Sequence, residues 1–176
     1  MIMTATALRD YITSDLSDEV LEERLAAIEG LIRSYTNNPF VMPGWGQDAE
    51  LLEGGLLCVS EGLYSEGDTL LITHSKRSDG LYTVSSVEDG AIYKLSSDTL
   101  DDKGFVNLVY YPPEVKMGAV LMLSYDLSRE GSEGVKSETI SRHSVEWEDS
   151  SEESTILGYP MHIASFLKSY RKARRY

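Results

Sequence analysis

The sequence predicts an α+β fold: a small helical bundle of about four helices with an inserted small antiparallel β-sheet or barrel module. Three observations predict it. Apolar residues recur every three or four positions from Leu21 to Tyr35, the period of a helix with one buried face. Short apolar runs between turn residues fill positions 40–111, and helical patterns return after Pro112. We therefore expect a helical body, 1–39 and 112–176, around an inserted β-rich module, 40–111.

Two helices are expected before the β-rich module. Residues 4–13 predict a short helix with Leu8, Tyr11 and Ile12 on one face. Ser17 predicts the start of a longer helix, because a serine side chain accepts hydrogen bonds from the first N–H groups of a helix. The Asn37-Asn38-Pro39 run ends that helix. Its predicted core stripe consists of Leu21, Leu25, Ile28, Ile32 and Tyr35.

The β-rich module is predicted from short apolar runs at 56–59, 69–73, 81–87, 91–95 and 105–110. Turn signals separate these runs at Gly67-Asp68, Asp79-Gly80, Asp89-Gly90 and Lys103-Gly104. The two Asp-Gly pairs are the strongest hairpin signals, since glycine adopts the positive φ that tight turns require. Strands at this spacing are typical of a small antiparallel sheet or barrel.

A third helix is expected to start at Pro112-Pro113, because proline is tolerated in the first turn of a helix. From Val115 to Leu127 this helix is apolar nearly all round, which predicts burial on most sides. A central position in the bundle explains this pattern, and contact of one part with another subunit is a second explanation. Gly131 and Gly134 are expected to end the helix.

An extended arm is predicted before the C-terminal helix. Its sequence is VKSETISRHSVEW, from Val135 to Trp147, and residues 144–147 alternate as a strand does. An acidic loop follows. The last helix is expected to start at Pro160, with an apolar face of Ile163, Phe166, Leu167 and Tyr170. Five of the last nine residues are basic. Their charge either complements the C-terminus of the helix or docks on an acidic surface, such as that of a neighbouring copy.

Charge and composition limit the classes of function. The chain has 176 residues and a net charge of −13, and its first 167 residues carry 11 basic and 29 acidic side chains. Such an acidic body should repel nucleic-acid phosphates. No apolar run is long enough to span a membrane, and no secretory pattern opens the sequence. Because Cys58 is the only cysteine, the composition fits synthesis in a reducing cytoplasm.

No motif predicts catalysis. The histidines His74, His143 and His162 have no zinc-ligand spacing, and the acidic run 146–153 lacks the pattern of a calcium loop. Cys58 lies in an apolar run and is expected to be a small buried side chain. We therefore expect no enzyme activity, no catalytic or metal-binding residues and no cofactor.

Four segments together resemble the head-tail connector (adaptor) proteins of tailed bacteriophages and prophages. They are LRDYI…LSDEVLEERLAAIEGLIRSYTNNPF, PPEVKMGAVLMLSYDL, SETISRHSVEW and YPMHIASFLKSYRKAR. The resemblance implies a virion protein at the neck, in a ring that is usually twelve-fold, with double-stranded DNA passing through the lumen without specific binding. Its implied partners are itself, the portal protein and a tail stopper or tail-completion protein, and no membrane. The β-rich segment departs from compact members, which join the second and third helices more directly.

The resemblance also implies which residues make contacts between subunits or with the portal. They lie in the arm and the C-terminal segment, both expected to be mobile in the free protein and to order on docking: Ser137, Glu138, Ile140, Arg142, Val145, Trp147, Phe166, Lys168, Tyr170, Arg171, Lys172, Arg174, Arg175 and Tyr176. Two alternatives stay open. One is another neck protein, a tail stopper or terminator, and the other is a non-viral protein-binding module.

Overall fold

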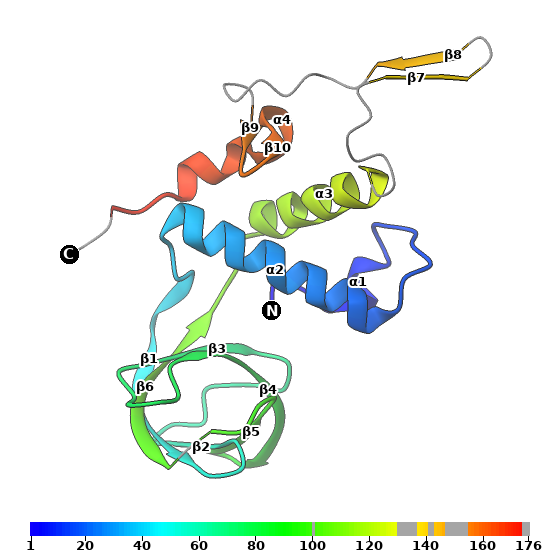
Figure 1. Ribbon diagram of the computed structural model, residues 1–176. Coiled ribbons are helices and arrows are strands. Elements are labelled where there is room, and N and C mark those ends of the chain that lie inside the picture. Colours follow the sequence, from blue (N-terminus) through cyan, green and yellow to red (C-terminus); the bar gives the residue numbers. More distant parts are fainter. Residues whose placement is uncertain (100, 130–136, 141–142, 147–154, 174–176) are drawn as a thin grey trace. The chain divides into compact units, whose positions relative to one another are not determined.

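The protein has an α+β fold. In the residues that the computed structural model describes, the chain forms four helices and a closed six-stranded antiparallel β-barrel (Figure 1). Those residues are 1–99, 101–129, 137–140, 143–146 and 155–173. The chain divides into two compact units: the first comprises Met1 and Pro39–Tyr111, and the second comprises Ile2–Asn38 and Pro112–Tyr176. The barrel belongs to the first unit and the helices belong to the second.

The barrel closes in a Greek-key order. Its spatial order is β1-β2-β5-β4-β3-β6, and β6 pairs with β1 to complete it. Strands β3, β4 and β5 are successive neighbours, and β6 returns to lie beside β3. The strands are β1 (Val41–Leu52), β2 (Leu56–Val59), β3 (Thr69–Thr73), β4 (Gly80–Asp89), β5 (Ile92–Leu95) and β6 (Asp102–Val109).

The predicted hairpin at Asp89-Gly90 is confirmed, and the one at Asp79-Gly80 is confirmed only in part. Strands β3 and β4 pair antiparallel, but Gly80 is the first residue of β4, opposite Ile72, and residues 74–79 connect the two strands. Strands β4 and β5 pair on either side of Asp89-Gly90, where Gly90 has a φ of 31°. The turn chemistry of Asp89-Gly90 therefore accounts for the tight connection between β4 and β5, whereas a longer loop connects β3 to β4.

Two features of the barrel differ from expectation. Strand β1 was not predicted, because Pro43, Gly44 and Gly46 interrupt any regular alternation; its pairing with β6 is irregular between Val41 and Gly46. The predicted turn at Lys103-Gly104 is wrong, since both residues lie within β6. A Cβ at Gly104 would lie 3.2 Å from the Thr73 carbonyl oxygen, so this glycine serves close strand packing.

The barrel interior is filled by inward-facing side chains from all six strands. Leu51, Leu70 and Ile72 are fully buried, and Tyr93 is the largest fully buried side chain. The Tyr93 ring packs edge-on against Tyr64 at a centroid distance of 5.5 Å. These alternating positions give the barrel a packed core.

The two ends of the barrel segment meet. Val41, at the start of β1, pairs with Val109, at the end of β6. The Tyr110 amide donates a hydrogen bond of 2.7 Å to the Phe40 carbonyl, and the rings of Phe40 and Tyr111 lie 5.0 Å apart. The chain therefore enters and leaves the barrel at one place.

Helix α1 (Ala5–Leu8) is shorter than the predicted helix at 4–13. The Arg9 side chain explains the early end: it donates to the Ser14 and Leu16 carbonyls and forms a 2.6 Å ion pair with Asp18. These contacts turn the chain toward the next helix. Tyr11, predicted on the buried face, is consequently 56% exposed.

Helix α2 (Asp18–Thr36) confirms the clearest prediction. The Ser17 hydroxyl accepts a hydrogen bond from the Val20 amide, and Asn37 ends the helix in a left-handed conformation. Four of the five predicted core residues, Leu21, Leu25, Ile28 and Ile32, are buried, and Tyr35 is half-buried.

The second unit also contains the elements after the barrel. They are α3 (Pro113–Arg129), the paired strands β7 (Ser137–Ile140) and β8 (His143–Glu146), the paired strands β9 (Thr155–Ile156) and β10 (Tyr159–Pro160), and α4 (Met161–Ala164), which continues as the 3₁₀ helix η2 (Ser165–Tyr170). Helix α3 starts one residue after Pro112, as expected. The glycines predicted to end it, Gly131 and Gly134, lie outside the described residues. No helix in the described part of the chain has the length and apolarity needed to cross a membrane.

Candidate assembly surface

The predicted arm forms a two-stranded antiparallel hairpin. Strands β7 and β8 pair Ser137 with Glu146, Glu138 with Val145 and Ile140 with His143. Four predicted contact residues therefore lie on these two strands. Arg142, Trp147, Arg174, Arg175 and Tyr176 lie outside the described residues.

The C-terminal segment packs on helices of its own unit. Leu167 and Ala164 are fully buried. The Lys172 amide donates a 2.7 Å hydrogen bond to the Thr36 carbonyl. Side chains of Asn37 and Asn38 donate to the carbonyls of Ala173 and Tyr170 at 3.2 and 3.1 Å. The expectation of a mobile tail is therefore wrong for residues 161–173, because their apolar face completes the core of this unit.

Two predicted contact residues are held within the chain. Phe166 lies against Gly118 of α3, where a Cβ would come closer than 3.0 Å to three ring carbons. The Tyr170 hydroxyl donates a 2.8 Å hydrogen bond to the Glu114 carboxylate. That hydrogen bond raises the pKa of Tyr170 above its usual value, since ionising the phenol would place two negative charges together.

The basic residues of this segment gather beside the C-terminal end of α2. Arg171 lies over the Tyr35 ring, with its guanidinium carbon 5.2 Å from the ring centroid. Lys168, Arg171 and Lys172 are exposed. We call these three residues the basic end. Their positive charges interact favourably with the negative C-terminal end of the α2 dipole, and their charged groups remain accessible to a partner.

One face of α3 is apolar and exposed. Met117 and Leu121, one turn apart, are 40% and 50% exposed. Ser124 and Ser128 continue this face, so no charged side chain interrupts it for three turns. The prediction of burial on most sides is wrong for this face, because α2, α4 and η2 cover only the opposite side of α3. Its alternative, contact with another subunit, stays a prediction.

The exposed side of α2 is also uncharged in its second half, a feature that the sequence analysis missed. Its exposed residues there are Ala26, Ala27, Gly30, Leu31 and Ser34. The signal was available: no acidic residue interrupts this face after Glu23, in a chain with 29 acids. Depletion of charge is the compositional mark of the centre of protein interfaces.

Tyr159, in the segment that follows the arm, is held against α3 by a hydrogen bond. The Tyr159 hydroxyl donates a 2.7 Å bond to Asp126 of α3, and its ring packs edge-on against Tyr125 at 5.9 Å. Arg129 lies over the Tyr125 ring, with its guanidinium carbon 5.4 Å from the ring centroid. Burial, and then the hydrogen bond to the Asp126 carboxylate, raise the pKa of Tyr159 well above its usual value.

This contact predicts a loss of stability at alkaline pH. Because the pKa of Tyr159 is higher in the folded than in the unfolded chain, its contribution is complete below the unfolded pKa of about 10 and declines as pH rises further. As the pH rises from roughly 9 to 11, a range that brackets that pKa, the Tm of Tyr159→Phe should therefore fall less than the Tm of the wild type. Tyr11→Phe, at an exposed ring, is the matched control; equal falls in Tm for wild type and Tyr159→Phe would contradict the assignment.

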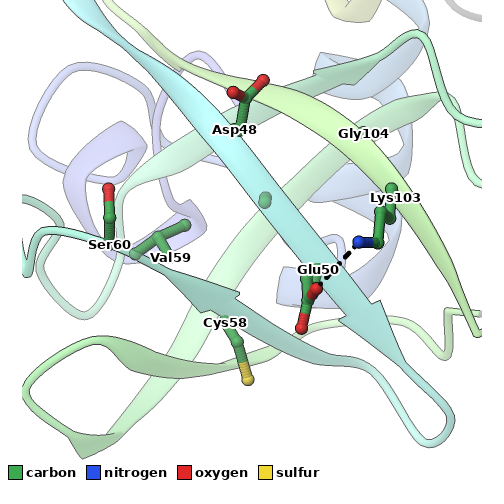
Figure 2. A pocket seen from close by; sticks show the side chains of 8 residues that line it. Asp48, Glu50, Cys58, Val59, Ser60, Lys103 and Gly104 are labelled. Atoms are coloured by element: carbon green, nitrogen blue, oxygen red, sulfur yellow. Dashed lines mark ion pairs between the residues drawn. The ribbon is translucent and has the colours of Figure 1, made fainter.

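A shallow hollow of about 470 Å³ lies on the barrel, over the outer faces of β1, β2 and β6 (Figure 2). Lys103 points toward Glu50 across it, at 3.2 Å, but both side chains are well exposed, so the pair adds little stability. Cys58 lines the hollow and is partly exposed, so the prediction of a buried thiol is wrong: in β2 it alternates with the inward-facing Leu57. The carboxylates of Asp48 and Glu50 line the same hollow, and Glu50 lies opposite Cys58 in the pairing of β1 with β2.

The histidines and carboxylates do not form a metal site in the described ranges, where no group of three or more His, Cys, Asp or Glu side chains could hold an ion. His74 is exposed, with its Nδ1 atom 3.1 Å from the Thr73 hydroxyl. The chain matches no protein-family model and no curated protein.

Proposed function

We propose that this protein is a structural subunit of a phage neck: a head-tail connector that forms a twelve-fold ring between the portal vertex of the DNA-filled head and the tail-completion proteins. The exposed apolar face of α3 carries the assembly part of this proposal. Met117 and Leu121 leave apolar surface in water that burial against another chain would remove. No acid interrupts this face from Met117 to Ser128, and Glu114, one turn earlier, accepts a hydrogen bond from Tyr170. The four segments that resemble connectors support the particular assembly.

The hairpin of β7 and β8 supports a contact role for the arm. In the part of the chain that the structure describes, no third strand joins this pair. An isolated two-stranded hairpin is marginally stable in water at best, so packing against a partner would stabilise it. Unpaired N–H and C=O groups at a sheet edge also offer a template for a strand of another subunit or of the portal.

The finer architecture in this proposal is a helical body formed by α2, α3 and the C-terminal segment, with the barrel inserted in the chain between α2 and α3. The body assembles and DNA passes through the ring. Net negative charge would let DNA slide through the lumen without binding, because acidic walls repel phosphates. A ring structure with basic residues along its channel would contradict this role for the acids.

Deletion of the gene from the phage or prophage that encodes it tests the proposed function. Electron microscopy of the lysate should show DNA-filled heads beside separate, complete tails. Joined, normal particles would overturn the connector proposal and favour a protein-binding module, which would also be monomeric. Expression of the wild-type chain from a plasmid should restore joined particles.

The α3 face gives a sharper test. Leu121→Glu should leave the fold intact, because the side chain is half exposed, yet abolish complementation of the deletion, because a buried unpaired carboxylate is costly at an interface. Val87→Glu, which introduces the same charge at an exposed apolar residue of the barrel, should complement normally. Infectious titre measures both. Full complementation by Leu121→Glu would remove α3 from the assembly surface.

A further inference from the structure

The two ends of α2 carry opposite charge. At its N-terminal end and in the turn before it, Asp10, Asp15, Glu19 and Glu23 are exposed; we call these four residues the acidic end. The basic end, Lys168, Arg171 and Lys172, lies beside the C-terminal end, where the Lys172 amide is hydrogen bonded to Thr36. A helix of 19 residues separates them by about 28 Å. The second unit is therefore electrically polar along α2.

The dipole of α2 explains only part of this arrangement. A helix dipole favours acids near the first turn and bases near the last turn, by a few tenths to about 1 kcal/mol each, and the effect falls off within that turn. Glu19 lies in the first turn. Asp10 and Asp15 precede the helix, and Glu23 lies in its second turn, so the dipole does not account for them. Arg9, the neighbouring cation, forms its ion pair with Asp18, which is not one of these four residues.

We propose that the basic end of one copy docks on the acidic end of α2 in a second copy. This inference rests on the proposed function, since it takes another copy of the chain as the partner. Charge complementarity selects that partner: the chain itself presents the acidic surface that the basic end would neutralise. Nucleic acid fits less well, because the first 167 residues carry 11 basic against 29 acidic side chains and repel phosphate.

In a head-to-tail arrangement each added copy leaves one acidic and one basic end open, so association continues until a ring closes or a filament grows. A two-fold dimer with antiparallel α2 helices would also pair both ends, and it would stop at two copies. The proposed ring uses the head-to-tail arrangement, so the size of the assembly distinguishes the two. The contact also depends on salt, since charges on an exposed surface are screened over about 8 Å at physiological ionic strength.

Charge reversal at each end tests the contact. In sedimentation velocity at low salt, the full-length wild type should form assemblies larger than a dimer. Both K168E/K172E and E19K/E23K should weaken self-association on the order of tenfold, because two attractive pairs become repulsive. An equimolar mixture of the two variants should restore assemblies of wild-type size, since each reversed end then meets its complement. Circular dichroism checks that both variants fold.

A reversal elsewhere separates this contact from general repulsion. K76E/R77E changes the net charge by the same amount as K168E/K172E, at two exposed residues of the barrel, and should leave self-association within about twofold of wild type. A monomeric wild type at its highest soluble concentration, or no recovery on mixing, would overturn the proposal. A second outcome would also overturn it: the wild type does not self-associate, but it binds a duplex oligonucleotide more tightly than K168E/K172E does. That result would assign the basic end to nucleic acid.

These results are independent of the deletion test. If the deletion strain shows separate heads and tails but mixing the variants restores no assembly, the connector proposal stands and the proposed contact is wrong. Joined particles in the deletion strain, together with full recovery on mixing, would keep the contact and discard the connector.

Discussion

Leu167→Ala should lower the free energy of unfolding by about 2–5 kcal/mol, the range for truncating a buried leucine. Leu167 is fully buried, and η2, which carries it, contacts both α2 and α3. Removing three carbons there leaves a cavity that the surrounding helices fill only in part. Denaturant unfolding followed by circular dichroism measures the change.

The neighbouring residue supplies the control for this prediction. Lys168→Ala, at an exposed position of the same 3₁₀ helix, should change the free energy of unfolding by no more than about 0.5 kcal/mol. If Leu167→Ala also stayed within that limit, the C-terminal segment would not be part of the core. The prediction of a tail that orders only on docking would then return.

Alanine substitutions at two helical glycines should have opposite effects. Alanine is favoured over glycine by about 1 kcal/mol in a helix interior. At Gly30 of α2 a Cβ meets nothing within 4 Å, so Gly30→Ala should raise stability by about that amount. At Gly118 of α3 the Cβ would overlap the Phe166 ring, so Gly118→Ala should lower stability by about 1–3 kcal/mol.

A second substitution tests the cause of that loss. In a Phe166→Ala background the overlap is gone, so Gly118→Ala should become neutral or stabilising there. The double-mutant cycle then gives a coupling energy between the two positions. A loss of the same size with and without Phe166 would show that the ring is not what limits position 118.

Local signals predicted α2 well, because each of its determinants lies within a few residues. The Ser17 cap and the 3.6-residue spacing of the buried leucines and isoleucines act inside the helix itself. The hairpin at Asp89-Gly90 was predicted for the same reason. Gly104 failed because its role depends on Thr73, a residue of a strand 31 positions earlier in the chain.

The candidate surface was less predictable, since burial depends on distant neighbours. Composition alone did not separate Met117 and Leu121 from the buried residues of α3. The basic C-terminal segment had the composition of a mobile tail, yet Leu167 is buried and Lys172 is hydrogen bonded to Thr36. Both errors concern which element packs on which face of a helix, and the hydrophobic period of a single helix does not contain that information.

The meeting of Phe40 and Tyr110 has a consequence for how this chain can be rebuilt. A segment whose first and last residues are hydrogen-bonded neighbours can be cut out, and a turn of a few residues can bridge the gap without stretching what remains. The same junction allows residues 39–111 to be grafted into a surface loop of an unrelated protein. Gain or loss of the barrel in a single step, by recombination or by design, would then leave the helices on either side with unchanged sequences and lengths.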